Sequence, residues 1–286
     1  MRGDGDGWVQ CNLGHRHWGK FGAAGLMLFT AVDGQPQVLL QHRAPWCHHG
    51  DTWGIPGGAR DSHEDAVAAA LREAGEEAGV DPSGVTVHRE SADEHGGWTY
   101  TTVIAYADHR LDTQPNAESL ELVWQPLEAT AGLPLHPGFG ATWPELLPRP
   151  VELLVDTANV VGSRPDGWWR DRVGATNRQL AELATLRSRV IGLPDGGHGL
   201  VVSVTAVLEG IARQSVAPAP VRVVLAQGSG DDALAERAAD MTARAAAGGP
   251  PPVGPTSLVV VTADRGLRAR LPATAMVVGP RWLAEL

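Results

Sequence analysis

The fold of the first half of this chain is decided by the stretch Gly58-Ala-Arg-Asp-Ser-His-Glu64, followed after seven residues by Arg72-Glu73-Ala74-Gly75-Glu76-Glu77-Ala78-Gly79-Val80. Its Ala-rich sequence predicts a helix from about Glu64 to Ala78. Ser62 and Asp65 have the spacing of a capping box at the start of this helix, and Gly79 stands where a left-handed helix end favours glycine.

Three glutamates lie on this helix at spacings i, i+3 and i+4, so Glu73, Glu76 and Glu77 would share one face. Like charges at this spacing repel one another, whereas a hard divalent cation such as Mg²⁺ takes oxygen ligands and would relieve the repulsion. Three glutamates alone favour a solvated acidic face. The residues around them change that interpretation.

The whole stretch resembles the Nudix box, G-x5-E-x7-R-E-U-x-E-E-x-G-U, where U is a bulky aliphatic residue. Each named position is filled at its spacing, by Gly58, Glu64, Arg72, Glu73, Glu76, Glu77 and Gly79. Ala74 departs from the family's preference for a larger aliphatic residue, at a position that holds no ligand. The lead-in Trp53–Gly58 also resembles the family's loop before the helix, and the resemblance covers about residues 20–130.

The Nudix resemblance implies an α/β/α sandwich that hydrolyses a diphosphate linked to another moiety, with Mg²⁺ or Mn²⁺ as cofactor. It assigns the three glutamates as metal ligands and the Gly57 carbonyl as a fourth. It also implies that Arg72 orients the carboxylates and pairs with Glu64. Metal ions in such a site neutralise developing charge and lower the pKa of the attacking water.

Residues outside the box would supply the base and the substrate contacts. We expect Glu118 to activate the attacking water, with Glu121 as the alternative. Either residue could instead be only a charged residue of the surface. Substrate contacts are expected from Arg43, His48 and Trp53. A nucleotide base could stack on a tryptophan, although core or loop packing is the alternative for each; the other candidates are Trp18, Trp46 and Trp98.

Two groups of cysteine and histidine, Cys11-x3-His15-x-His17 and Cys47-His48-His49, offer the ligands of a tetrahedral zinc site. Neither has the C-x2-C spacing typical of zinc motifs. We therefore favour the alternative, in which His48 and His49 line the loop before the helix and contact substrate or solvent. Two cysteines cannot form a disulfide framework, and a reduced, cytoplasmic setting is expected.

A Pro-rich stretch from Leu133 to Pro150 resists helix and ladder pairing and predicts a boundary, which gives a Nudix domain over residues 1–147 and a second domain over residues 148–286. The first domain would contain strands at Ala23–Val32, Val38–Gln41 (around a turn at Asp33-Gly34), Thr101–Tyr106 and Leu120–Trp124.

The second domain alternates short β-rich runs with helical stretches at Thr176–Arg189 and Asp232–Ala247, which predicts an α/β fold with a largely parallel sheet. Gly248–Pro255 is of low complexity and predicts a flexible loop. The β-rich runs are Leu153–Val155, Leu200–Leu208, Val221–Leu225, Leu258–Val261 and Ala275–Val278.

Acidic residues stand at the ends of these runs. Because the carboxyl ends of parallel strands meet at one sheet edge, we expect a shared metal site there, with helix capping as the alternative for each acid. The expected members are Asp156, Asn159, Glu209, Asp231, Asp232 and Asp264.

This ensemble resembles the PIN-like nucleases, particularly the NYN branch, over about residues 151–283. Three features carry this resemblance. An Asp-x-x-Asn sequence begins at the end of the first strand, a Gly-rich loop contains two consecutive Asp residues, and a Thr-x-Asp-Arg sequence follows a later strand. The resemblance implies a metal-dependent ribonuclease; a dimerisation or docking domain is the alternative.

Asp171 is a further site member or an ion-pair partner. Nearby side chains could grip phosphate and stack bases, or form an interdomain surface: Arg164, Trp168, Trp169, Arg170 and Arg172.

Charge differs between the two halves. Residues 1–147 carry 8 basic and 20 acidic side chains, and residues 148–286 carry 15 and 13. An acidic half could attract divalent metal, and a near-neutral, Arg-rich half repels a polyanion less. The alternative is two solvated surfaces that differ only in composition. Hydrophobic residues make up 43% of the chain and charged residues 20%, which excludes wholesale disorder. No apolar run approaches the ~20 residues that cross a bilayer, and the acidic start is no signal peptide.

The sequence therefore predicts a Nudix pyrophosphatase that cleaves the diphosphate linkage of a nucleoside diphosphate derivative, either in the nucleotide pool or at an RNA 5′ end. Its expected partners are a nucleotide substrate, RNA and a second copy of the chain, with no membrane. The alternative is a Nudix-type nucleotide sensor that regulates a nucleic-acid-binding or docking domain. The intact box argues against a sensor, which need not retain Glu76 and Glu77.

Overall fold

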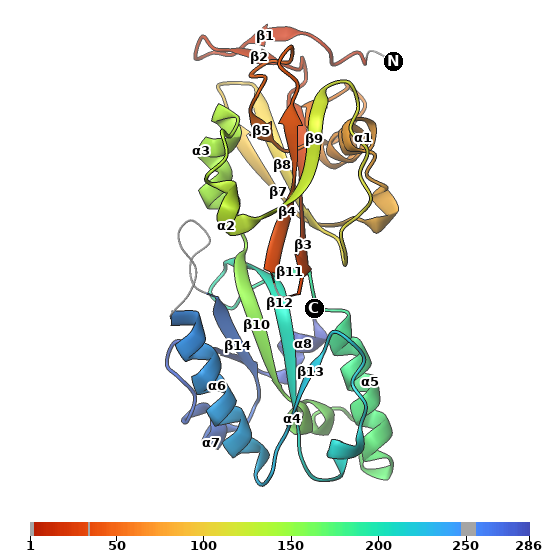
Figure 1. The fold of residues 1–286 in the computed structure, drawn as a ribbon, viewed down its shortest axis with the longest axis vertical. Helices are drawn as coiled ribbons and strands as arrows, with labels where there is room; N and C mark the ends of the chain where they lie inside the picture. Colours follow the sequence, from red (N-terminus) through yellow and green to blue (C-terminus); the bar gives the residue numbers. More distant parts are fainter. Residues whose placement is uncertain (1–2, 34, 247–255) are drawn as a thin grey trace. The chain divides into compact units, whose positions relative to one another are not determined.

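The computed structural model describes residues 3–33, 35–246 and 256–286. The chain forms two compact units, Met1–Leu147 and Pro148–Leu286 (Figure 1). Gly34 of the expected turn and the whole expected loop Gly248–Pro255 lie outside the described residues. Among the described helices, none is long and apolar enough to span a membrane.

The first unit is built on a seven-stranded mixed sheet in the order β5-β4-β3-β8-β7, with β6 paired to β3 and β9 paired to β4. Its central pair, β3 and β8, is parallel and runs from Ala23↔Tyr100 to Phe29↔Tyr106. All four predicted strands are present; one has the predicted bounds and the other three are longer. The strands are β3 Ala23–Val32, β4 Gln35–Arg43, β5 Trp53–Gly54, β6 Gly57–Ala59, β7 Thr86–Glu94, β8 Thr99–Tyr106 and β9 Ser119–Pro126.

Helix α1, Ala66–Ala78, packs its alanine face on this sheet. Small side chains let the helix approach β3 closely, and Ala70 and Ala74 are fully buried against a core that includes Leu26 and Leu28. The left-handed end at Gly79, with φ 66°, is as predicted.

The predicted capping box is wrong. The N-cap is Asp65, whose Oδ1 accepts from Ala68 N at 2.7 Å, so the helix begins two residues later than expected. Ser62 instead donates its hydroxyl to Asp4 Oδ2. Asp at an N-cap performs the same function as Ser, so the sequence offered two residues that could cap this helix and only the fold selects one.

Several elements of the first unit were not predicted from the sequence. They include an antiparallel hairpin near the N-terminus, β1 Trp8–Gln10 with β2 Arg16–Trp18, and the short helices η1 Pro82–Gly84 and α2 Leu127–Thr130. The Pro-rich stretch contains a helix, α3 Pro137–Leu146, which corrects the expectation that it resists helix formation. Pro137 stands at the first helical position, where its missing N–H is not needed.

The second unit is an α/β domain with a six-stranded sheet in the order β11-β12-β10-β14-β15, with β13 paired to β12. All its strand pairs are parallel except β11 with β12, so the predicted parallel sheet is correct. The strands are β10 Arg149–Asp156, β11 Val190–Gly192, β12 His198–Leu208, β13 Arg222–Leu225, β14 Ser257–Val261 and β15 Met276–Val278.

Helices cover both faces of this sheet. Leu153 and Val155 face a core that contains Leu180 and Leu183, while Leu154 faces one that contains Leu234. The predicted helix Thr176–Arg189 corresponds to α5 Arg172–Ala184, which is shifted toward the N-terminus and followed by turns before β11. The other helices are α4 Thr157–Gly162, η2 Trp168–Arg170, η3 Gly210–Gln214, α6 Gly230–Ala246, α7 Arg265–Arg268 and α8 Pro280–Ala284.

Candidate active site

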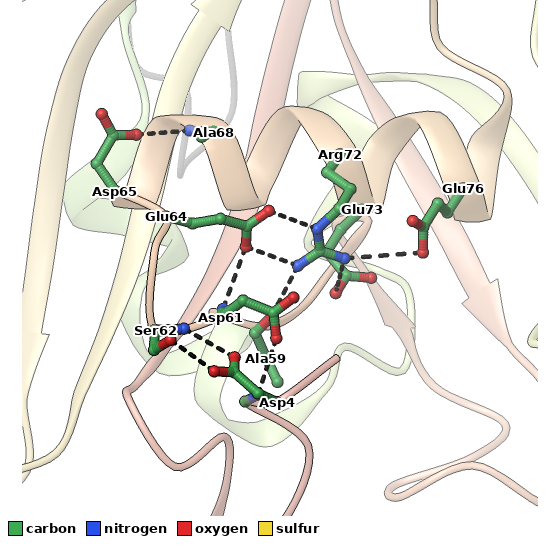
Figure 2. Close-up of polar contacts among 11 residues, drawn as sticks. Asp4, Ala59, Asp61, Ser62, Glu64, Asp65, Ala68, Arg72, Glu73 and Glu76 are labelled. Carbon is green, nitrogen blue, oxygen red and sulfur yellow. Dashed lines mark hydrogen bonds and ion pairs between the residues drawn. The ribbon is translucent and has the colours of Figure 1, made fainter. Parts of the chain in front are cut away.

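Arg72 is the centre of a charged network on α1 (Figure 2). Its Nε donates to Glu64 Oε1 at 2.7 Å and its Nη2 to Glu64 Oε2 at 3.0 Å, a bidentate pair. The same Nη2 donates to the Ala59 carbonyl at 2.9 Å, which ties the helix to β6. The hydrogen bond from Arg72 lowers the pKa of Glu64, so this carboxylate stays ionised.

The third nitrogen of the same guanidinium reaches the glutamates of the next turn (Figure 2). Arg72 Nη1 donates to Glu73 Oε1 at 2.9 Å and lies 3.7 Å from Glu76 Oε2. One cation therefore hydrogen-bonds two carboxylates through the rigid planar fork of arginine and forms an ion pair with a third, the more exposed Glu76.

Glu77 lies apart from Arg72 and is buried, with 5% of its surface exposed. Its Oε2 accepts from Gly57 N at 2.9 Å. Burial raises the pKa of Glu77 to about 8, with a further contribution from Glu73, and burial also raises the pKa of Glu73. Two crowded carboxylates that are partly withdrawn from water form the donor set that a hard divalent cation prefers.

Strand β6 approaches these carboxylates closely because its first two residues, Gly57 and Gly58, lack side chains. A Cβ on Gly58 would lie 2.5 Å from Glu73 Oε1, and a Cβ on Gly57 would lie 2.5 Å from Gly25 Cα. Position 57 therefore requires glycine, because the contact is with backbone, whereas a side chain at position 58 would displace the Glu73 carboxylate. The two glycines bring backbone within reach of the glutamates.

The N-terminal segment secures the loop between β6 and α1 (Figure 2). Asp4 Oδ1 accepts from Ser62 N at 2.9 Å, and Asp61 Oδ1 accepts from Gly5 N at 2.8 Å. Asp61 N in turn donates to Glu64 Oε2 at 3.1 Å. Asp4 was not predicted from the sequence, because a side chain 58 residues from its partner leaves no local pattern.

The carboxylates open into a groove of about 1780 Å³ in the first unit. Its walls come from the β1–β2 hairpin, the loop after β4, the β7–β8 pair and α3. Of the predicted substrate contacts, Arg43 and His48 line the groove. Trp53 does not: its ring stacks on His42 with centroids 4.7 Å apart, which corrects that assignment. Among the other tryptophan candidates, Trp18, Trp46 and Trp98 all line the groove.

Glu118 and Glu121 are separated by the structure. Glu118 lines the groove with the three glutamates, and its charge contributes to the raised pKa of Glu77. Glu121 is exposed on β9 opposite His42 and is not a lining residue. This placement favours Glu118 over Glu121 as the candidate base.

Other residues that line the groove were not predicted from the sequence. Arg89 on β7 and Tyr100 on β8 line it, and Arg89 Nε is buried without a hydrogen-bond partner in the described chain. Burial lowers the pKa of this guanidinium, while burial and the Glu77 charge raise the pKa of Tyr100. Ser91 and Asp93 follow Arg89 at period two and line the same groove wall. Ala92 between them lines it too, so alternation along the strand is only a partial signal.

The cysteines and histidines form two separate clusters. Cys11, His15 and His17 bring one ligand atom each within 4.8 Å of the others, and so do His48, His49 and His136. Cys47 belongs to neither; its Sγ donates to the Glu118 carbonyl at 3.7 Å. Cys47 therefore does not join Cys11, His15 and His17 in a single site.

In the second unit, three adjacent parallel strands bring acids to one edge. Asp156 ends β10, Glu209 follows β12 and Asp264 follows β14. Asp156 Oδ2 accepts from Thr262 Oγ1 at 2.8 Å, and Asn159 Oδ1 accepts from Ala263 N at 2.9 Å.

Asp231 joins these acids from the start of α6. Burial raises its pKa, and the charges of Asp264 and Glu209 raise it further. Burial also raises the pKa of Asp156, with contributions from Asp231 and Glu209. Asp232 forms an ion pair with Arg270 at 2.5 Å, although its charge also raises the pKa of Asp231. The structure therefore brings four of the predicted acids near one another and pairs the fifth with an arginine.

The other polar candidates of the second unit have structural partners. Asp171 is the N-cap of α5 and accepts from Gly174 N at 2.8 Å. Arg164 pairs with Glu182, and the Arg172 guanidinium lies 5.2 Å from the centroid of the Trp168 ring. Capping and intradomain packing thus account for part of the predicted phosphate-binding cluster.

Comparison with known proteins finds a match to the NUDIX domain family over residues 20–143. The chain is 52% identical over 159 residues to a protein of Mycobacterium tuberculosis named "Putative 8-oxo-dGTP diphosphatase 3", covering 52% of this chain and 72% of that one. It is 40% identical over 155 residues to a Bifidobacterium longum "Nucleoside triphosphate pyrophosphatase/Nudix hydrolase fusion protein", covering 52% and 32%. A solved Nudix hydrolase from M. smegmatis, RenU, is 52% identical, with a TM-score of 0.48, over 50% of this chain and 92% of that one.

Proposed function

This chain belongs to the Nudix family and is a Nudix pyrophosphohydrolase, and from that premise we propose that its first unit cleaves the diphosphate linkage of a nucleoside diphosphate derivative with Mg²⁺ or Mn²⁺. The observation that carries the proposal is the carboxylate set of α1. Arg72 donates to Glu73 and lies within ion-pair distance of Glu76, and the buried Glu77 accepts from Gly57 N of β6 in the same groove.

Glu73, Glu76 and Glu77, with the Gly57 carbonyl, would hold the metal. The fit rests on the oxygen donors and on the raised pKa of two of the glutamates, which a nearby cation would reverse. A bound metal would neutralise charge on phosphate oxygens and lower the pKa of the attacking water.

The remaining roles belong to side chains of this chain. Arg72 orients the metal-binding carboxylates and leaves Glu64 as its fixed counter-ion. Glu118 would accept a proton from the attacking water, since it is exposed in the groove that the three glutamates share. Arg43 and Arg89 would bind phosphate oxygens, because both guanidinium groups line that groove.

For the substrate, we place 8-oxo-dGTP first, because a relative with 52% identity carries that activity in its name. Tryptophans suit a purine base: Trp18, Trp46 and Trp98 line the groove, and Trp46 is 72% exposed. Other nucleoside triphosphates, dinucleoside polyphosphates, nucleotide sugars and the 5′-triphosphate end of RNA belong in the same panel.

The test is turnover by the purified full chain on this panel with Mg²⁺ or Mn²⁺, with and without a chelator. The proposal expects product from at least one compound, none after chelation, and a large loss in Glu77→Gln but not in Glu121→Gln. Glu121→Gln is a matched control, since it removes the same charge outside the groove. Tight nucleotide binding with a thermal shift and no cleavage across the panel would show that the chain is a nucleotide sensor and contradict the hydrolase proposal.

A second candidate function concerns the second unit, for which we propose a PIN-like, metal-dependent ribonuclease. Asp156, Glu209, Asp231 and Asp264 come from separate segments, and the charges of their neighbours in this set raise the pKa of both Asp156 and Asp231, which supports a shared cation site. RNA is the partner that this function requires.

The test compares cleavage of labelled single-stranded RNA with Mn²⁺ by the full chain and by Asp156→Asn and Asp264→Asn, all carrying Glu77→Gln to silence the first unit. Loss of cleavage in both variants supports the nuclease. Equal cleavage by all three indicates a contaminant, and none by any favours a docking domain or a homodimer interface.

A further inference from the structure

We propose that Cys11, His15 and His17 form a zinc site that fixes the β1–β2 hairpin beside the groove, a site distinct from the glutamate cluster. The thiol sulfur and one ring nitrogen of each histidine all lie within 4.8 Å of one another. The hairpin itself brings them together. Cys11 N donates to the His15 carbonyl at 2.9 Å, and Gly14 N donates to the Cys11 carbonyl at 2.9 Å, so the turn holds the first two ligands side by side.

The donor atoms select the metal. One thiolate and two imidazoles are ligands typical of zinc, whereas Mg²⁺ and Mn²⁺ prefer the oxygen donors of α1. Zinc bonds of about 2.3 Å to sulfur and about 2.0–2.1 Å to nitrogen place tetrahedral ligands roughly 3.4–3.6 Å apart. Small side-chain rotations would bring the present cluster to that spacing.

His17 is held in place for such a role. Its ring stacks on Trp98 with centroids 4.1 Å apart and an interplanar angle of 12°. Trp98 is itself fixed, since its Nε1 donates to the Gly19 carbonyl at 2.8 Å. His17 Nε2 is buried and has no hydrogen-bond partner among the residues described. A metal ion bound to His17 would relieve the loss of hydration at this ring.

A fourth ligand is within reach on the adjoining turn between β7 and β8. The His95 ring centroid lies 5.0 Å from that of His17. Its Nε2 is 3.1 Å from Asp93 Oδ2, a pairing of the kind that orients metal-binding histidines. Backbone already links the two turns, because Asn12 N donates to the Gly96 carbonyl at 2.8 Å. We assign the fourth position to His95 or to a water molecule.

Zinc at this position would stiffen one wall of the groove. Trp8 and Trp18 of the hairpin pack edge to face at 5.5 Å, and Trp8 also contacts His48 of the opposite loop at 5.3 Å. His15, His17 and Trp18 line the groove. Losing the metal should therefore raise KM for a substrate bound there several-fold more than it lowers kcat.

The experiment measures metal content of the full chain. Protein loaded with zinc is dialysed in excess Mg²⁺ to remove weakly bound ions, and zinc per chain is then determined by mass spectrometry. We expect about one zinc per chain in the wild type and a loss of at least tenfold in Cys11→Ser and in His15→Asn. His15 is exposed, so its variant keeps the fold. Cys47→Ser is the matched control, because it removes the other cysteine and leaves the cluster intact.

Cobalt substitution identifies the ligand directly. Co²⁺ bound to a thiolate gives a charge-transfer absorption band, which we expect in the wild type and in Cys47→Ser but not in Cys11→Ser. Wild-type protein without retained zinc would overturn the proposal. So would zinc retained in Cys11→Ser and lost in His49→Asn, because that result places the metal in the cluster of His48, His49 and His136.

Discussion

The negative charge of the two acidic sites is compensated in different ways. In the first unit, the carboxylates of Glu64, Glu73 and Glu76 surround one guanidinium, Arg72, on a single helix. In the second unit, Asp156 and Glu209 accept hydrogen bonds, within the described chain, only from neutral donors: the Thr262 hydroxyl and backbone N–H groups.

This difference shows how each site keeps its geometry. The first site has a built-in counter-ion, so most of its carboxylates are oriented before any metal binds. The second is held by helix caps and strand ends from distant segments. Among the described residues, Arg270 is a cation whose charge acts to lower the pKa of Asp231, but its ion pair is with Asp232. We therefore expect substitutions to affect turnover and ion pairing in the first unit, and helix capping and charge repulsion in the second.

The largest expected effect is on turnover in the first unit. Glu76→Gln or Glu77→Gln should lower kcat by at least ~100-fold, which corresponds to ~2.7 kcal/mol of transition-state stabilisation. Folding should survive, since either change removes a like charge and the amide introduced by Glu77→Gln keeps an acceptor for Gly57 N. Steady-state kinetics on the best substrate measures it, and near wild-type turnover in both variants would reject the metal assignment.

The next effect is on stability. Arg72→Gln leaves Glu64, whose side chain is 9% exposed, without its bidentate partner, and should lower the free energy of unfolding by about 1–3 kcal/mol. Arg281→Gln is the comparison, because its exposed pair with Glu285 should contribute only about 0.3–0.5 kcal/mol. Chemical denaturation measures both. Equal losses would mean that Arg72 provides no special support.

A smaller effect is expected from a helix cap in the second unit. Asp264 Oδ1 accepts from Leu267 N at 2.7 Å, so Asp264→Ala should lower stability by about 0.5–2 kcal/mol. Asp264→Asn should nearly restore it, because asparagine caps as well as aspartate. If Asp264→Asn is as unstable as Asp264→Ala, the negative charge matters and the cap interpretation is insufficient.

The smallest effect is expected at Asp156. Asp156→Asn keeps one acceptor oxygen, for Asn159 N, and its NH2 group can donate to the Thr262 hydroxyl, which can also accept. The change removes a charge near Asp231 and Glu209, so stability should stay level or rise by about 0.5 kcal/mol, the size of a like-charge pair. Thermal unfolding of the full chain without divalent metal measures this. A clear loss of stability would show that the second site, like the first, depends on a paired charge.

Local sequence patterns predicted a large part of this architecture. The apolar runs of β3, β8 and β12, the alternation of strands and helices in the second unit and the glycine end of α1 all follow from residues within a few positions of one another. Longer-range features were less accessible. The α3 helix lies inside a Pro-rich stretch, and Trp53 stacks on His42 rather than facing the groove.

By itself, the sequence determined the Nudix helix and its glutamate face, because the spacing of side chains on a helix is fixed by 3.6 residues per turn. It also placed acids at the ends of parallel strands. The tertiary structure alone decided which residues share a site: Glu118 rather than Glu121 in the groove, Asp4 beside Ser62, and Cys11, His15 and His17 apart from Cys47. These choices depend on packing between segments distant in the chain, which leaves no periodic signal in the sequence.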